Sequence, residues 1–164
     1  MTMEQAIITW VHLVSAAIWV GGGLFLGVVL APILKKTSMS LEERISLMIT
    51  VGRRFNRIAV PSLIILIATG IYSSHSLLSK PGLLFETSYG SFLVIKIILV
   101  IAVIVTFAVH VRVIRKDVEE QIMSNKMSEK QIQKLRKKII ILGEVVSVLS
   151  VAVLFFAALL DAGV

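Results

Sequence analysis

Residues 91–111 read SFLVIKIILVIAVIVTFAVHV, an apolar run in which Lys96 is the single charged residue. At 1.5 Å per residue, a helix of this length spans roughly 30 Å, the thickness of a bilayer's hydrocarbon core. Three more runs are long enough to cross, and they occupy residues 6–34, 58–74 and 139–160. Backbone groups in lipid must be satisfied within the segment, so such runs form helices. The sequence therefore predicts an all-α, polytopic membrane protein, a four-transmembrane-helix bundle that forms a single domain over residues 1–164.

Composition and charge support this fold class and indicate a topology. The chain is 57% hydrophobic with a mean hydropathy of +0.94, which excludes an ordinary soluble domain. Six Lys or Arg fall between the first two runs and nine between the last two, whereas the middle loop has only Lys80. Positive residues concentrate in cytoplasmic loops, so we expect loops 1–2 and 3–4 to be cytoplasmic and both termini outside. The net charge of +7 then reflects topology and contact with the lipid bilayer, with no nucleic acid involved.

Short polar signals indicate helix ends outside the apolar runs. Ser40 with Glu43, and Ser128 with Gln131, have the spacing of capping boxes. We expect one helix to begin at Ser40 and run into the second span, and a basic helix to lead into the fourth. The third span is expected to continue as a helix through Arg115. The first run lacks the small-residue cleavage site of a signal peptide and is expected to be retained.

Two polar side chains lie at similar depths in different spans. His12 and Lys96 are each about 8–9 Å from the outward edge, as judged from the helical rise. Inserting a charged side chain into the membrane at such a depth costs roughly 2.5–3.5 kcal/mol of free energy, so the side chain normally faces the protein interior. On a regular helix Trp19 shares the face of His12 and could wall a flat pocket. His12 is either an interhelical hydrogen-bonding group or a haem ligand, and Lys96 either reaches the headgroups or contacts the same cofactor.

His110 and Glu144 form a possible second polar layer, nearer the cytoplasmic edge. Residues 96 and 110 are separated by about 21 Å along a helix, so one metal ion cannot join the two layers. We expect His110 at the membrane interface. Glu144 needs a partner in a dry bundle, and Arg57 or His110 is within reach.

Copper is less favoured than haem on the available ligands. Soft thioether and thiolate groups select copper(I) in proteins. All six methionines lie outside the predicted spans, and the chain has no cysteine. A buried copper path through the bundle is therefore poorly supported.

Several short motifs carry a resemblance to two related membrane families. Trp10-Val-His12, Trp19-Val-Gly21-Gly22 and Lys96 resemble the copper-resistance CopD domain, as does Leu135-Arg-Lys-Lys followed by Leu142-Gly-Glu144. The His12–Trp19 spacing and Lys96 equally resemble the HemJ-type protoporphyrinogen oxidase, a haem-b membrane protein whose functional pair is a first-span histidine and a third-span lysine. Residues 24–28 lack the arginine that HemJ-type proteins have there. The resemblance thus implies haem binding in a prokaryotic plasma membrane rather than porphyrinogen oxidation.

We therefore expect a haem-b-binding membrane protein for electron transfer or haem handling. Its cofactor site would contain His12, Lys96 and Trp19, with His12 as the metal ligand and Lys96 as second ligand or propionate partner. The protein could be a homo-oligomer or a subunit of a respiratory or oxidase complex; as an enzyme it would be an oxidoreductase of the HemJ-like type. Two alternatives stay open: CopD-like copper transport or resistance, and a cofactor-free accessory subunit whose polar groups only fix helix packing.

The topology can be tested by labelling single cysteines from outside intact cells. A cysteine at Ser79 should react with an impermeant reagent, whereas one at Ser124 should react only after the membrane is opened, because the positive loops stay inside. Labelling of the Ser124 position from outside would overturn the orientation.

Overall fold

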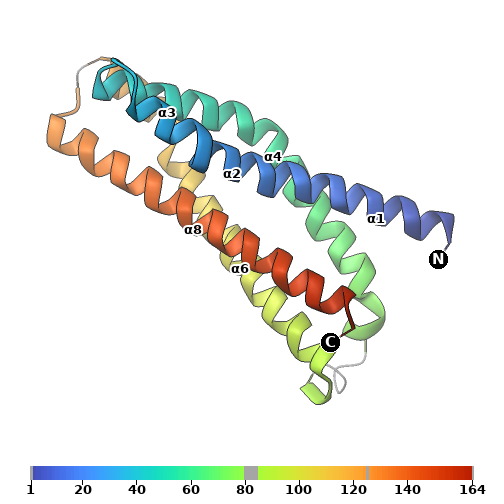
Figure 1. Ribbon diagram of the computed structural model, residues 1–164. Helices are drawn as coiled ribbons and strands as arrows, with labels where there is room; N and C mark the ends of the chain where they lie inside the picture. The colour runs from blue at the N-terminus through green and yellow to red at the C-terminus, as the bar shows by residue number, and fades with distance from the viewer. Residues whose placement is uncertain (1, 80–84, 125, 164) are drawn as a thin grey trace.

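Every regular element of the described chain is a helix. The computed structural model describes residues 2–79, 85–124 and 126–163 (Figure 1). The first span is one continuous rod made of α1 (Met3–Ala16), the π-helical turn η1 (Ala17–Gly21), α2 (Gly22–Leu24), the π-helical turn η2 (Phe25–Leu30) and α3 (Ala31–Lys35). The remaining helices are α4 (Leu41–Leu78), α6 (Ser88–Val113), α7 (Lys116–Met123) and α8 (Glu129–Asp161).

Four helical stretches are long and apolar enough to cross a membrane. They cover Met3–Lys35, Leu41–His75, Ser88–Met123 and Glu129–Asp161. The prediction of an all-α, four-span membrane protein is therefore confirmed, and each predicted span lies inside a longer helix. Lys80, the lysine of the middle loop, lies outside the described residues.

The helix starts follow the capping signals of the sequence. The Ser40 hydroxyl accepts from the Glu43 backbone N–H at 3.2 Å, and the Glu43 carboxylate accepts from the Ser40 N–H at 2.8 Å. Ser128 and Gln131 make the same reciprocal pair before α8. These contacts satisfy N–H groups that a helix start otherwise leaves unpaired. The second span consequently extends far beyond its apolar run, as expected from Ser40.

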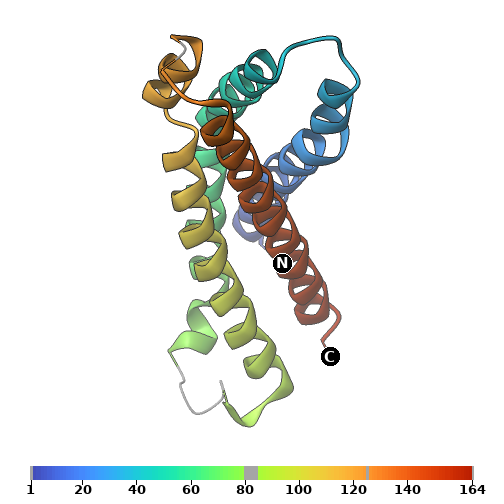
Figure 2. The same cartoon turned by 90° about the vertical axis from the view of Figure 1, so that its left-hand side faces the viewer.

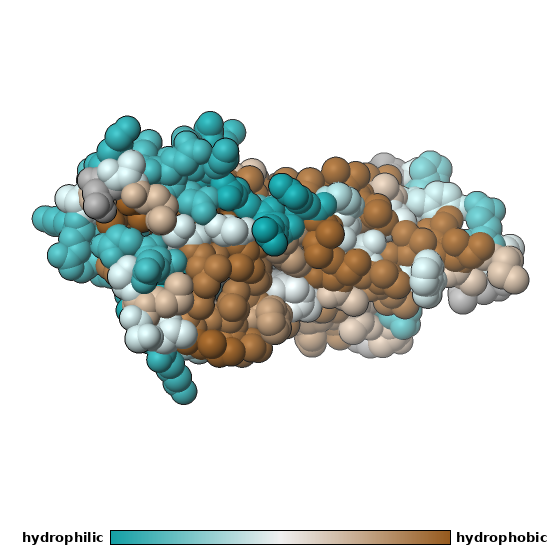
Figure 3. All heavy atoms as spheres, turned by 90° about the horizontal axis from the view of Figure 1, so that it is seen from above, coloured by the Kyte–Doolittle hydropathy of each residue, from teal (hydrophilic) through white to brown (hydrophobic). Residues whose placement is uncertain are grey.

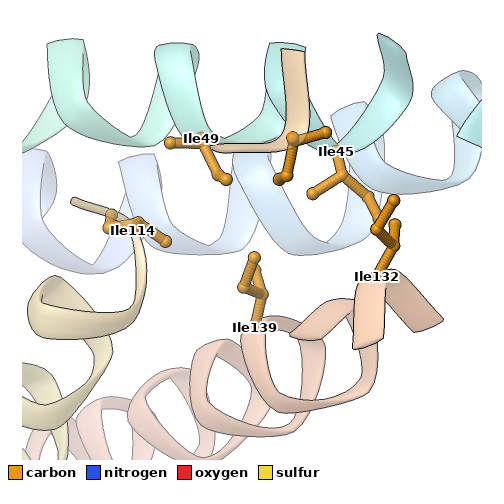
Figure 4. Close-up of a cluster of buried hydrophobic side chains, with 6 residues drawn as sticks. Ile45, Ile49, Ile114, Ile132 and Ile139 are labelled. Atoms are coloured by element: carbon orange, nitrogen blue, oxygen red, sulfur yellow. The ribbon is translucent and has the colours of Figure 1, made fainter. Parts of the chain in front are cut away.

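The third span ends earlier than expected, and this prediction was wrong. Its helix stops at Val113, Ile114 leaves the helix with ψ near 30°, and Arg115 is extended before α7. Ile114 is 2% exposed because it belongs to a cluster of buried isoleucines. Figure 4 shows five members of that cluster, Ile45, Ile49, Ile114, Ile132 and Ile139, converging from α4, α8 and the end of α6. Burial of Ile114 thus competes successfully with continuation of the helix.

A polar contact holds α7 against α4 at the same end of the molecule. Glu119 of α7 pairs with Arg53 at 2.6 Å and accepts hydrogen bonds from Ser46 and Thr50, all on α4. Removing one charged partner of such a half-buried ion pair leaves the other charge without compensation. The turn after α6 is therefore fixed by both the isoleucine cluster and Glu119.

The four spans are arranged as two packed pairs. The first span lies along α4, and α6 lies along α8, as Figures 1 and 2 show from two directions. The middle of the first span also contacts α8 through η1, α2 and η2. The two pairs are therefore joined both by the π-helical part of the first span and, at the other contact, by the isoleucine cluster and α7.

The surface separates into an apolar flank and one strongly hydrophilic end. In Figure 3 hydrophilic side chains gather at the end that holds α3, α7 and the beginnings of α4 and α8, which we term the basic end. Along the flank, large apolar side chains such as Val28 and Val148 are 69% and 68% exposed. Such a surface suits lipid rather than water. The chain is a multi-pass membrane protein.

The contact between the first span and α4 can be tested at two neighbouring glycines. A Cβ added at Gly22 would lie 2.2 Å from Cε2 of Phe55, whereas one at Gly21 would meet nothing within 4 Å. Gly22→Val should therefore lower stability by about 1–3 kcal/mol through overpacking. Thermal unfolding in detergent measures the loss. Gly21→Val is the matched control, and an equal loss in both variants would contradict the close approach.

Candidate functional site

His12 is held by a hydrogen bond to α4. Its Nδ1 lies 2.6 Å from Oγ1 of Thr69, and Thr69 donates its only hydroxyl proton to the carbonyl of Ile65, also at 2.6 Å. With the hydroxyl proton directed to Ile65, the Thr69 oxygen accepts and the His12 Nδ1–H donates, and this is the tautomer that we infer. A neutral imidazole with its proton on Nδ1 carries a lone pair on Nε2. The bond thus fixes the ring and leaves Nε2 as the nitrogen available to a ligand.

Lys96 lies at the same level of the bundle. It projects from α6, is half-buried, and lies within electrostatic range of the His12 ring. Within the described residues Lys96 has no hydrogen bond or ion pair, and none joins it to His12. The two residues that the sequence placed at one depth thus come from α1 and α6 without a direct bond between them.

Trp19 belongs to a different part of the bundle. Its Nε1–H donates to Oγ of Ser150 on α8 at 3.0 Å, and its ring meets Phe107 edge-on with centroids 4.8 Å apart. The expectation that Trp19 walls a pocket beside His12 assumed a regular helix. Trp19 lies within η1, where the wider π-helical turn changes the angular spacing, and its side chain is buried between α4, α6 and α8, whereas His12 bonds to α4.

Trp19 does line a cavity, as its position beside small residues suggested, but His12 is not part of that cavity. The cavity measures about 540 Å³ and lies between the second half of the first span, α4, α6 and α8. Its polar lining side chains include Trp19, His110, Glu144 and Ser147, whereas His12 and Lys96 are not among its lining residues. The available signal was the small residues Gly23, Gly27 and Gly143, which leave room along two facing helices.

His110 and Glu144 both line this cavity, yet they do not pair as expected. The Nδ1 of His110 is buried and has no hydrogen-bond partner in the described chain, and its ring lies over Gly143. Glu144 is exposed toward the cavity and makes no hydrogen bond or ion pair with Arg57, His110 or any other described residue. The predicted partner for Glu144 is therefore absent from this part of the chain. The carboxylate meets the open crevice, which spares it the cost of full burial.

The two histidines stay in separate layers. His12 contacts Thr69 and the backbone at Gly70, while His110 lies over Gly143. Among the described residues there is no group of three or more His, Asp or Glu that could hold a metal ion. A ligand at either histidine would therefore take one protein nitrogen and find its other contacts elsewhere.

Among the comparisons with known proteins, only the scan against family models finds a match. A scan against protein-family models matches residues 49–160 to the family described as copper resistance protein D. The match covers most of α4, all of α6 and nearly all of α8, including Lys96, His110 and Glu144, and it leaves His12 and Trp19 outside. No curated protein and no solved structure matches the chain.

The Trp19–Ser150 bond should contribute measurably to the joining of the two helix pairs. A double-mutant cycle with Trp19→Phe and Ser150→Ala is expected to give a coupling of about 0.6 kcal/mol, with about 1.7 kcal/mol as the upper range for bonds inside membranes. Unfolding in mixed micelles supplies the free energies. A parallel cycle with Ser147→Ala should show no coupling, since Ser147 lines the same cavity without bonding to Trp19. Equal coupling in both cycles would contradict the assignment.

Proposed function

The chain belongs to the copper resistance protein D family, and we propose that it binds haem b through His12 and transfers electrons in the membrane. The proposal goes beyond the family assignment and rests on the chemistry around His12. Both termini and the His12 layer would face the outside of a prokaryotic plasma membrane, in keeping with the distribution of Lys and Arg.

The observation that carries the proposal is the bond from His12 to Thr69. Histidines that bind metals nearly always donate their other ring N–H to an acceptor, which sets the tautomer and the ring orientation. The Thr69 oxygen supplies that acceptor, because its own proton is committed to Ile65. His12 would thereby be oriented with Nε2 free to bind the iron of a haem. Bound haem would supply one-electron redox chemistry at this level of the bundle.

Lys96 would complete the site from α6. Its position beside His12 suits an ammonium that neutralises a haem propionate, and a deprotonated amine there would suit direct ligation of the iron. Replacing Lys96 by arginine distinguishes the two roles. An arginine keeps the positive charge and pairs with carboxylates, but it stays protonated and cannot ligate.

Copper handling is the second candidate, and the printed description of the family is what favours it. The chemistry of the donors is less suited to copper: the chain has no cysteine, and none of its six methionines lies in a predicted span. The described part of the chain also holds no group of three His, Asp or Glu. Metal analysis of the same preparation as the haem test separates the two candidates.

Electron transfer would require a redox partner. With haem at His12, and with no group of three His, Asp or Glu in the described residues to hold a second metal, the protein would receive its electrons from another membrane component or a diffusible carrier. We therefore propose that the protein works within a larger membrane complex or as a homo-oligomer.

Absorption spectra of the detergent-purified protein, oxidised and dithionite-reduced, test the proposal. The wild type should show a Soret band and sharpened reduced bands, and His12→Ala should lose them while remaining helical. Thr69→Val keeps the side-chain shape and removes the acceptor, so haem affinity should fall about 10–100-fold, as for other outer partners of metal ligands. Lys96→Met should weaken haem binding or shift the redox potential of the haem. Lys96→Arg should keep the wild-type binding and potential only if Lys96 pairs with a propionate.

His110→Ala is the matched control, since His110 is the other histidine inside the bundle. It should leave the spectrum unchanged. Loss of the spectrum in His110→Ala with a normal spectrum in His12→Ala would place the cofactor in the large cavity. Copper without haem in the wild type would favour the second candidate, and neither metal nor haem would leave a cofactor-free accessory subunit.

A further inference from the structure

We propose that the crevice between the first span and α8 binds one anionic phospholipid. Its phosphate would lie among Lys35, Arg44 and Arg136 at the basic end, and an acyl chain would follow the large cavity toward Trp19. This site is separate from His12 and does not depend on haem binding.

Three cations from different helices meet at the basic end. Lys35 ends α3, Arg44 lies in the first turns of α4, and Arg136 lies in the second turn of α8, and all three line a small hollow. Arg44 is turned toward α3, where its Nη1 donates to the carbonyl of Lys35 at 3.4 Å. No carboxylate lines the hollow, and none of the three cations has an ion-pair partner among the described residues. An anion is therefore the missing partner of this cluster.

The small hollow and the large cavity are adjacent. Ala31, Lys35, Met48 and Ile140 line both of them. The hollow itself has room for only about 20 Å³, so a phosphate would lie over its mouth, in contact with the three cations. A ligand that fills both spaces must have an anionic end and a long apolar part.

The large cavity is suited to the apolar part. Leu26, Leu30 and Val151 are among its lining side chains, and its outer rim includes the exposed residues Val28 and Val148, which would face lipid. From residue 136 to residue 151 on α8 the distance is about 22 Å by helical rise. Half of a bilayer, headgroups included, is likewise about 20–22 Å thick. One leaflet lipid thus matches the site in length as well as in charge.

Glu144 sets the direction in which such a ligand can lie. It is the one carboxylate among the residues that line the two spaces, and it lies about 12 Å along α8 from Arg136. A phosphate near Glu144 would be repelled, whereas an acyl chain carries no charge. The negative group of the ligand is therefore confined to the basic end.

Native mass spectrometry of the whole chain in detergent, titrated with phosphatidylglycerol, tests the charge requirement. Arg44→Gln/Arg136→Gln should bind the lipid roughly 20-fold more weakly, because each cation near a lipid headgroup contributes about fivefold. Lys137→Gln/Lys138→Gln makes the same change of charge on exposed neighbours that do not line the hollow, and it should bind like the wild type. Glu144→Gln should bind as tightly as the wild type or more tightly. An equal loss in both double variants would overturn the proposal.

The apolar part is tested by filling the crevice from the first span. Gly27 lines the cavity, Gly21 does not, and an added Cβ meets nothing within 4 Å at either position. Gly27→Leu should therefore weaken phosphatidylglycerol binding at least severalfold, while Gly21→Leu should not. Circular dichroism checks that both variants stay helical. Equal binding of phosphatidylglycerol by both variants would contradict an anionic lipid site. So would binding of phosphatidylcholine, or of inorganic phosphate alone, as tight as the binding of phosphatidylglycerol to the wild type.

Discussion

Lipid offers no hydrogen bonds, and polar side chains inside this bundle must therefore find their partners within the protein or face an open crevice. The first span meets this constraint at two levels. His12 bonds to Thr69 on α4, and Trp19 bonds to Ser150 on α8. The span thereby contacts both helix pairs, α4 along its first half and both α4 and α8 at its π-helical turn.

The two layers are chemically different. At His12 a single imidazole is oriented by a committed hydroxyl, with one cation nearby, which is an arrangement for a ligand held by one nitrogen. At the cavity, a buried His110 nitrogen and an unpaired Glu144 line a wide, mostly apolar space that runs to three cations at the basic end. The family match over residues 49–160 includes Thr69 and Lys96 of the first region and His110 and Glu144 of the second. It leaves out the residues that the first span contributes to each region, His12 and Trp19 among them.

Local signals in the sequence were sufficient for the spans and for the helix starts at Ser40 and Ser128, because hydropathy and capping act within a few residues. The common level of His12 and Lys96 also followed from residue counting. Two features could not be obtained in this way. The π-helical turns around Trp19 rotate one face of the first span, and the break at Ile114 depends on isoleucines from α4 and α8 that are distant in sequence. Both arise from contacts between helices, and the missing partner of Glu144 has the same origin.

The central claim is that Thr69 fixes the tautomer of His12 and leaves Nε2 free. Nitrogen-15 NMR of protein labelled at histidine measures it directly, with His75→Gln/His110→Gln as background so that one histidine remains. We expect a neutral ring with a hydrogen-bonded proton on Nδ1 and none on Nε2, and we expect Thr69→Val to change that pattern. A proton on Nε2, or a spectrum indifferent to the loss of Thr69, would contradict the account.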